Sequence, residues 1–152
     1  MTLRVEKRRP GAALPRRATT GSAGFDLCAR LDAPLTLEPG QRALVPTGIA
    51  IGLPAGTVGL VCARSGLAVR HGLTLSNGVG VIDSDYTGEV MVGLVHLGAE
   101  PYTVADGERI AQLLVIPALT AEIEETVALT ATARGAGGFG STGFAPLPDK
   151  TE

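Results

Sequence analysis

The sequence from Gly80 to Val90 is GVIDSDYTGEV, and it is the most informative stretch of the chain. It sets a carboxylate, Asp83, and an aromatic ring, Tyr86, beside turn-forming glycines and between two apolar runs. This arrangement predicts a β-hairpin with the acid and the ring at its bend. Such a bend can hold a flat ring against backbone donors and acceptors, and its carboxylate can hold a water. We therefore expect a β fold with a ligand site at this turn.

Turn signals continue along the chain at the spacing of a β-sandwich or barrel. The 152 residues include 21 glycines and 10 prolines, and turns separate short apolar runs about every 8–12 residues. The last of these runs lies at 122–129. The best helix candidate, 64–72, is short and has Ser65 as its expected N-cap. We predict one all-β jelly-roll domain with a single short helix.

Composition narrows the class of partner. The formal net charge is −2, so the chain lacks the strong positive field of a nucleic-acid-binding protein. The basic stretch 7–17 is interpreted as a solvated surface. We expect no signal peptide and no membrane span, because the N-terminus turns charged at once and no apolar run reaches about 20 residues. Cys28 and Cys62 form no CxxC motif, and we expect buried free thiols in a reducing cytoplasm.

The C-terminal part differs from the rest. From residue 130 it is rich in small residues and glycine and has no apolar periodicity. We therefore divide the chain into a β core, 1–129, and a flexible arm, 130–152. A disordered tail is the usual fate of such a segment. Phe139 argues against it, because a lone aromatic ring in a glycine arm is costly to leave in water unless it docks.

Two segments favour phosphate binding. Arg64, Ser65 and Gly66 open the expected helix, where free N–H groups, a hydroxyl and a guanidinium converge into an anion site; an ordinary cap with a surface arginine is the alternative. The glycine-rich stretch 135–143 lacks the lysine and the helix of a P-loop. Its small residues would still let backbone amides approach a polyphosphate closely, and Arg134 adds a forked donor.

Two further polar residues interrupt apolar strands. Gln112 lies in the run 110–114, where it either faces solvent or needs a polar partner. Asp26 lies in the segment 23–27, and a lone acid there is either a turn residue or a neighbour of Mg²⁺, which keeps its waters and takes few protein ligands. The two histidines are isolated and no Cys/His cluster exists, so the sequence predicts no zinc site.

These five segments, in this order, resemble the motifs of the trimeric deoxyuridine triphosphatase (dUTPase) family. The corresponding segments are 23–27, 64–66, 80–89, 107–112 and 134–143. The resemblance runs from about Phe25 to Gly143, which is nearly the whole domain, and the third and fifth motifs are the most specific. It implies a jelly-roll homotrimer that hydrolyses dUTP to dUMP and pyrophosphate with Mg²⁺. It also implies three active sites at subunit boundaries, each closed by the C-terminal arm of a neighbour.

The resemblance also assigns roles to residues. Asp83 would hold and deprotonate the attacking water, Tyr86 would lie under the deoxyribose and exclude a 2′-hydroxyl, and Asp26 would approach Mg²⁺ through water. The base would be held by Asn77, Gly80 and Val81. The phosphates would be contacted by Arg64, Ser65, Gly66 and Gln112. The arm would supply Arg134, Gly140, Ser141 and Thr142 around the terminal phosphate and Phe139 on the uracil.

The sequence departs from the family pattern at two positions, and other functions stay open. Ala63 stands where proline is frequent, and Glu108 stands where aspartate is usual. The first alternative is a dCTP deaminase or a bifunctional deaminase, which would use a glutamate in the Gly80–Val90 segment; Glu89 lies nearby. The second is a nucleotide-sensing regulatory protein on the same scaffold. A structural jelly roll, such as a capsid or lectin domain, would leave the arm unexplained.

Overall fold

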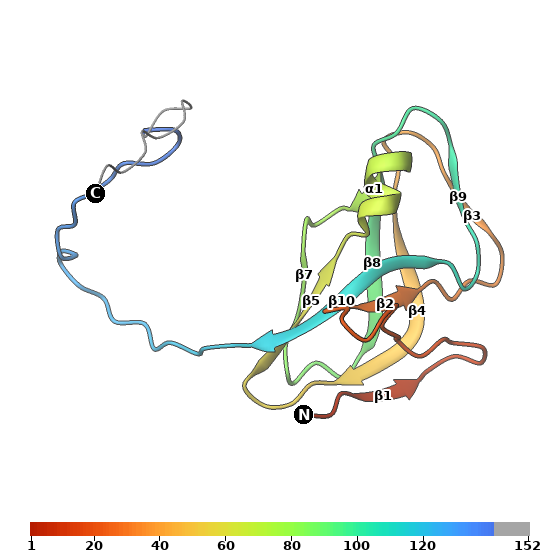
Figure 1. Ribbon diagram of the computed structural model, residues 1–152, viewed down its shortest axis with the longest axis horizontal. Helices are drawn as coiled ribbons and strands as arrows, with labels where there is room; N and C mark the ends of the chain where they lie inside the picture. The colour runs from red at the N-terminus through yellow and green to blue at the C-terminus, as the bar shows by residue number, and fades with distance from the viewer. Residues whose placement is uncertain (142–152) are drawn as a thin grey trace. The chain divides into compact units, whose positions relative to one another are not determined.

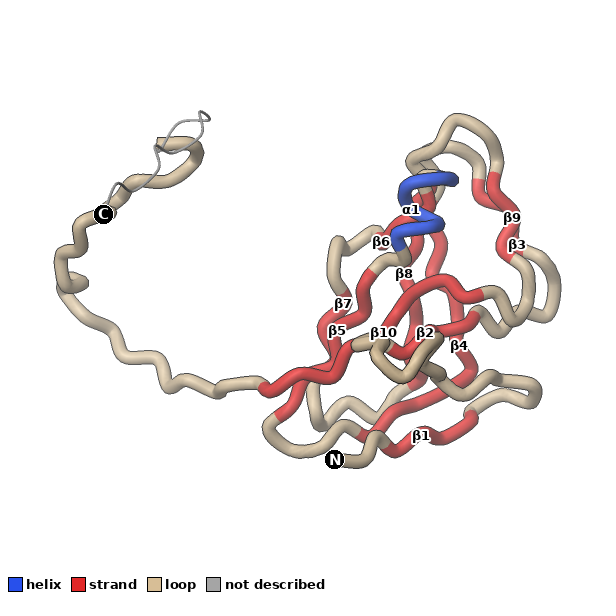
Figure 2. Tube along the Cα trace, viewed as in Figure 1, coloured by secondary structure: helices blue, strands red, loops and turns tan. Residues whose placement is uncertain are grey.

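The computed structural model describes residues 1–141, and its secondary structure is mostly β. Within this range the single helix is α1 (Ser65–His71), and no helix is long and apolar enough to cross a membrane. Figures 1 and 2 show the arrangement of the elements. The strands are β1 (Arg4–Lys7), β2 (Phe25–Cys28), β3 (Leu35–Leu37), β4 (Arg42–Gly52), β5 (Thr57–Cys62), β6 (Leu73–Leu75), β7 (Gly80–Ile82), β8 (Glu89–His96), β9 (Tyr102–Val104) and β10 (Arg109–Pro117).

The strands form two antiparallel four-stranded sheets and one small pair. One sheet has the order β1-β4-β8-β6, the other has the order β2-β10-β5-β7, and β3 pairs with β9. Non-consecutive strands lie next to one another in both large sheets, which is the crossed connectivity expected of a jelly roll. The predicted fold class, an all-β jelly roll with one short helix, is confirmed.

The core lies between the two large sheets because their strands alternate. On β8, the side chains of Val90, Val92 and Leu94 are buried while their neighbours are half-buried. Leu27 on β2 and Leu113 on β10 fill the other side of the same apolar cluster. Since successive residues of a strand point to opposite faces, the residues between these buried positions are directed outward and become available for a site.

The predicted hairpin at Gly80 to Val90 is wrong. β7 pairs with β5, whereas β8 pairs with β4 and β6. The segment that carries Asp83 and Tyr86 is therefore a crossover from one sheet to the other. Turn signals between two apolar runs mark a change of direction, but they do not say whether the two strands pair with each other.

The predicted N-cap at Ser65 is also wrong. Arg64 occupies the N-cap position, with extended backbone at φ −92° and ψ 125°, and no side chain caps the helix. The helix ends at Gly72, whose φ of 69° is the left-handed conformation typical of a C-terminal cap. A β-carbon at position 72 would clash with the backbone of Gly98, so the close approach of these two loops also requires glycine.

The chain divides after Thr120 into a compact unit, Met1–Thr120, and a second unit that begins at Ala121. The apolar run at 122–129 forms no strand in the described residues, and Ile123 and Val127 are fully exposed. This last apolar run therefore adds neither a strand nor buried side chains to the described part of the chain. Thr142 lies outside the described residues.

Candidate functional site

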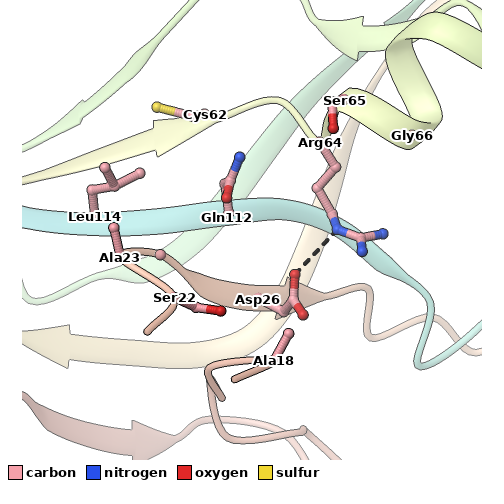
Figure 3. Close-up of a pocket in the computed structure, with 11 residues that line it drawn as sticks. Ala18, Ser22, Ala23, Asp26, Cys62, Arg64, Ser65, Gly66, Gln112 and Leu114 are labelled. Atoms are coloured by element: carbon pink, nitrogen blue, oxygen red, sulfur yellow. Dashed lines mark ion pairs between the residues drawn. The ribbon is translucent and has the colours of Figure 1, made fainter. Parts of the chain in front are cut away.

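The first site is built on the outward face of the sheet that contains β10. In the strand register, Gln112 of β10 lies opposite Asp26 of β2 on one side and Cys62 of β5 on the other. Directly opposed residues share a face, so these three side chains lie in a row across three strands. They line a pocket of about 530 Å³, together with Arg64, Ser65 and Gly66 from the start of α1 (Figure 3). Residues from the first, second and fourth motifs thus meet in one place.

Asp26 organises the charge in this pocket, which we call the phosphate pocket. Its side chain is only 17% exposed, and it forms two ion pairs. Its Oδ1 lies 3.1 Å from Arg64 Nε, and its Oδ2 lies 3.0 Å from Arg109 Nη1. Arg64 also donates from Nη1 to the backbone carbonyl of Arg109 at 3.0 Å. Two guanidinium groups face one carboxylate, so the cluster is cationic and is suited to an anionic ligand.

Arg109 was not among the predicted site residues, because a β-bulge sets the direction of its side chain. Positions 109 and 112 differ by an odd number, so simple alternation would put their side chains on opposite faces. The register shifts between Arg109 and Ala111, and both Ile110 and Ala111 are buried. The extra residue turns Arg109 to the same face as Gln112. The only available signal was its place in the fourth motif, directly after Glu108.

The side chain of Gln112, which was expected to face solvent or to need a polar partner, has a hydrogen-bond partner in the backbone. Its Nε2 donates to the backbone carbonyl of Ala63 at 3.0 Å, directly before Arg64. Its Oε1 would lie 2.9 Å from a β-carbon placed on Gly24. Gln112 therefore ties β10 to the turn that precedes α1, and a side chain at position 24 would press against the Gln112 amide.

The second site is a pocket of about 230 Å³ beside β7, lined by Asn77, Gly80, Val81, Asp83 and Tyr86 above an apolar floor. β7 is the last strand of its sheet and, among the described residues, pairs only with β5. An edge strand of this kind offers a row of backbone donors and acceptors. Its free edge can therefore hydrogen bond to the rim of a flat heterocycle.

Tyr86 is held in place on the rim of this second pocket, which we call the base pocket. Its hydroxyl donates to the backbone carbonyl of Glu89 at 2.9 Å. A β-carbon on Gly88 would lie 2.5 Å from that hydroxyl, so Gly88 makes room for the ring. Glu89 in turn is fixed by its carboxylate, which accepts from the Gly48 N–H at 2.8 Å and pairs with Arg9. The ring position thus depends on the neighbouring sheet.

Asp83 lies at the mouth of the base pocket and is exposed. Its backbone carbonyl accepts from the Tyr86 N–H at 3.1 Å, which closes a tight turn between the acid and the ring. A solvent-facing carboxylate beside a pocket can accept a proton from a water held there.

The two pockets share no lining residue. Val61 of β5 lines the base pocket, and its neighbour Cys62 lines the phosphate pocket. Adjacent residues of a strand point to opposite sides. The structure therefore brings the predicted residues together as two separate halves.

Residues 1–141 provide no cage of side chains for a bound metal. Among the described residues, no group of three or more His, Cys, Asp and Glu side chains gathers at one point. Asp26 is the one carboxylate that lines the phosphate pocket. This donor set fits a Mg²⁺ ion that keeps most of its waters and is held chiefly by a polyphosphate.

Two titratable groups near these elements are shifted. Burial, and then the charge of Asp26, raise the pKa of the Cys28 thiol. Cys28 and Cys62 are both free thiols, as expected, but each is half-buried and not fully buried. Burial, and then the hydrogen bond to Glu108, raise the pKa of Tyr102 to about 12. Glu108 also accepts from the Ala105 N–H at 3.0 Å. It closes the turn before β10 and lines neither pocket.

The second unit carries the remaining predicted residues. Arg134 donates from Nε to the Gly137 carbonyl at 2.9 Å, and the Ser141 N–H donates to the Gly138 carbonyl at 3.0 Å. Phe139 is fully exposed and has a positive φ of 51°, and Gly140 follows it at 89°. Thr142, the last predicted contact, lies outside the described residues.

Comparison with known proteins identifies the family. A family model described as dUTPase matches residues 11–143. The chain belongs to the dUTPase family. A deoxyuridine 5′-triphosphate nucleotidohydrolase of Desulfitobacterium hafniense is 56% identical to this chain over 131 residues. The match covers 86% of this chain and 87% of the relative. A protein of the same name from Anaeromyxobacter is 55% identical over 140 residues, 92% of the chain and 94% of the relative.

Solved dUTPase structures share the fold. A mutant dUTPase of Staphylococcus bacteriophage 80alpha in complex with dUpNHpp has a TM-score of 0.86 and 27% identity, and the match covers 94% of this chain and 99% of that one. A mutant dUTPase of phage phi11 of S. aureus, described with a structural Mg(II) ion, has a TM-score of 0.78 at 24% identity, over 86% of this chain and 100% of that one.

Proposed function

We propose that the chain is a dUTP diphosphatase that hydrolyses dUTP to dUMP and pyrophosphate, which would limit uracil incorporation into DNA and supply dUMP for dTMP synthesis. The observation that carries the proposal is the register of β2, β10 and β5, which gathers Asp26, Arg64 and Gln112 from three separate motifs into one cationic pocket. The base pocket adds an edge strand, a carboxylate and a ring. These are the groups that a pyrimidine deoxynucleoside triphosphate requires.

In this proposal each half of the site binds one half of the substrate. The free edge of β7 at Gly80 and Val81, together with Asn77, hydrogen bonds to uracil. Tyr86 lies beneath the deoxyribose and leaves no room for a 2′-hydroxyl. Arg64, with Ser65, Gly66 and Gln112, holds the phosphates and neutralises their charge as water cleaves the P–O bond of the anhydride linkage between the α- and β-phosphates.

Asp83 is the proposed general base. It holds a water in line with the scissile bond and accepts its proton when the water attacks. Asp26 would contact Mg²⁺ through a water, and the ion, when bound, would supply additional charge stabilisation on the phosphates. The arm would supply Phe139 against the base and Arg134, Gly140, Ser141 and Thr142 around the terminal phosphate, and its closure would exclude water.

The opposite placement of Val61 and Cys62 supports a shared site. One nucleotide that contacts both kinds of pocket would then bind the base pocket of one copy of the chain and the phosphate pocket of another. We therefore propose a homotrimer with active sites at the subunit boundaries, in agreement with the resemblance. We also propose a cytoplasmic location, which suits the free thiols of Cys28 and Cys62.

Complementation tests the shared site. Asp83→Asn and Arg64→Ala chains should each be inactive, but co-expressed chains should form mixed oligomers in which some sites are intact. Random assembly gives roughly a quarter of the wild-type activity, because each site needs two independent chains of the right kind. Co-expression that restores no activity, although mass spectrometry shows mixed oligomers, would refute a site built from two chains.

The reaction itself is tested with a nucleotide panel. Purified protein with Mg²⁺ should release pyrophosphate from dUTP and leave UTP, dCTP and dTTP largely untouched. The Glu89 carboxylate is occupied by Arg9 and the Gly48 N–H, so it is poorly placed to serve a deaminase as acid or base. Ammonia from dCTP without pyrophosphate from dUTP would overturn the proposal in favour of the deaminase. Tight dUTP binding without turnover would favour a nucleotide sensor.

A further inference from the structure

A third pocket, which is strongly basic, lies next to the phosphate pocket, and its cations have no role in the proposed reaction. It has a volume of about 430 Å³, and its charged lining comprises Lys7 of β1, Arg16 and Arg17 of the loop before β2, Arg109 of β10 and the carboxylate of Asp26. Four cations thus face one acid, in a chain whose net charge is −2. The basic stretch of the N-terminal region is therefore gathered around a cavity rather than dispersed over the surface.

Three of these cations are free to meet a ligand. Within residues 1–141, Lys7, Arg16 and Arg17 form no ion pair, and Arg109 pairs only with Asp26. Asp26 also pairs with Arg64, so its charge is already shared between two guanidinium groups. A concave surface lined by one sign of charge concentrates ions of the opposite sign.

The loop that carries the two arginines is anchored. The Asp26 N–H donates to the backbone carbonyl of Arg16 at 2.8 Å, which joins the loop to β2. The guanidinium of Arg17 lies 4.7 Å from the centre of the Phe25 ring, a cation–π contact that orients it. Anchoring lowers the conformational entropy that these side chains lose when they bind an anion.

The basic pocket adjoins the phosphate pocket through shared walls. Ala18 and Asp26 line both cavities. Asp26 directs Oδ1 toward Arg64 in the phosphate pocket and Oδ2 toward Arg109 in the basic pocket. An anion that leaves Arg64 would therefore meet a second group of cations directly beyond the same carboxylate.

We propose that the basic pocket is a second anion site that receives inorganic pyrophosphate released at the phosphate pocket. The identity of the anion rests on the proposed function, since cleavage of dUTP between the α- and β-phosphates yields pyrophosphate as the anionic leaving product. A diphosphate is longer and more highly charged than orthophosphate, so it can reach more of these guanidinium and ammonium groups at once. The pocket thereby draws the product away from the site of cleavage.

The test is calorimetric titration of inorganic pyrophosphate into the full-length protein while dUpNHpp and Mg²⁺ occupy the substrate site. We expect one pyrophosphate per chain. Replacement of Lys7, Arg16 and Arg17 together by Gln should weaken this binding by about tenfold, because three exposed charge contacts are lost. The matched control replaces Arg4, Arg42 and Arg70 by Gln, which removes the same charge outside the pocket. It should change the affinity by less than about twofold, because exposed charges at a distance are screened.

Several results would overturn the proposal that the basic pocket binds pyrophosphate. These are loss of pyrophosphate binding when dUpNHpp is bound, equal weakening in the control, no weakening in the triple variant, or equal affinity for orthophosphate. A second titration separates this proposal from the proposed function. Arg64→Gln removes the main cation of the phosphate pocket and should retain the pyrophosphate site whether or not the protein hydrolyses dUTP. Failure of the proposed function would appear instead as absence of turnover in the nucleotide panel.

Discussion

Gly88→Ala should displace the Tyr86 ring and damage catalysis more than stability. A β-carbon on Gly88 would lie 2.5 Å from the Tyr86 hydroxyl, 2.6 Å from Cζ and 3.0 Å from Cε2, all below a normal contact distance. The φ of Gly88 lies outside the left-handed region, so the backbone accepts alanine. The strain must therefore be relieved by the ring, which swings away by about an ångström and breaks its hydrogen bond to the Glu89 carbonyl.

The two consequences differ in size. Tyr86 is 45% exposed, so loss of its hydrogen bond should change the free energy of unfolding by only about 1 kcal/mol. A misplacement of about 1 Å in a substrate-positioning group costs about 10²-fold in rate. We therefore expect kcat/KM for dUTP to fall about 10²-fold while the melting temperature shifts by a few degrees. The preference for dUTP over UTP should also fall, because the ring no longer blocks the 2′ position.

Steady-state kinetics on dUTP and UTP, with thermal unfolding in parallel, measure both effects. Gly21→Ala is the matched control, because no atom lies within 4 Å of a β-carbon at that position and its φ is also outside the left-handed region. Tyr86→Phe with Gly88→Ala should recover part of the rate, since it removes the atom with the closest contact. A Gly88→Ala protein that keeps both its rate and its preference for the deoxy sugar would refute this account of Tyr86.

Three further predictions concern the base, the arm and an alkaline titration. Asp83→Asn should bind dUTP like the wild type but turn over about 10²–10⁴-fold more slowly in single-turnover assays; wild-type turnover would exclude it as the base. Truncation after Thr132 should abolish activity and leave folding and the oligomeric state unchanged, as measured by light scattering. Phe139→Ala should cost only ~1–3 kcal/mol of binding free energy. A truncated enzyme with full activity would show that the arm is a passive tail. Tyr102 should titrate near pH 12 by tyrosinate absorbance, because burial and the Glu108 hydrogen bond raise its pKa to about 12 from 10.0. Its contribution to stability is complete below pH 10 and is lost as the pH rises toward 12, and a Tyr102 midpoint near pH 10 would contradict the role given to burial.

The sequence by itself determined the fold class and the chemistry of the site. Frequent turns between short apolar runs indicated a β-sandwich or barrel, and the helix predicted at 64–72 is present at Ser65–His71, the one helix among the described residues. The polar residues that interrupt apolar strands, Asp26 and Gln112, line the same pocket. These features are local, because strand alternation and turn chemistry depend on residues close together in the chain.

Only the tertiary structure decided which segments lie next to each other. The crossover at Gly80 to Val90 resembles a hairpin in sequence, yet its strands join different sheets, because pairing depends on strands contributed from elsewhere in the chain. The bulge beside Ile110 turns Arg109 toward Asp26 against the simple alternation. The placement of Val61 and Cys62 on opposite faces separates the two pockets. Strand order, bulges and the sides of a sheet arise from long-range contacts, so no local pattern encodes them.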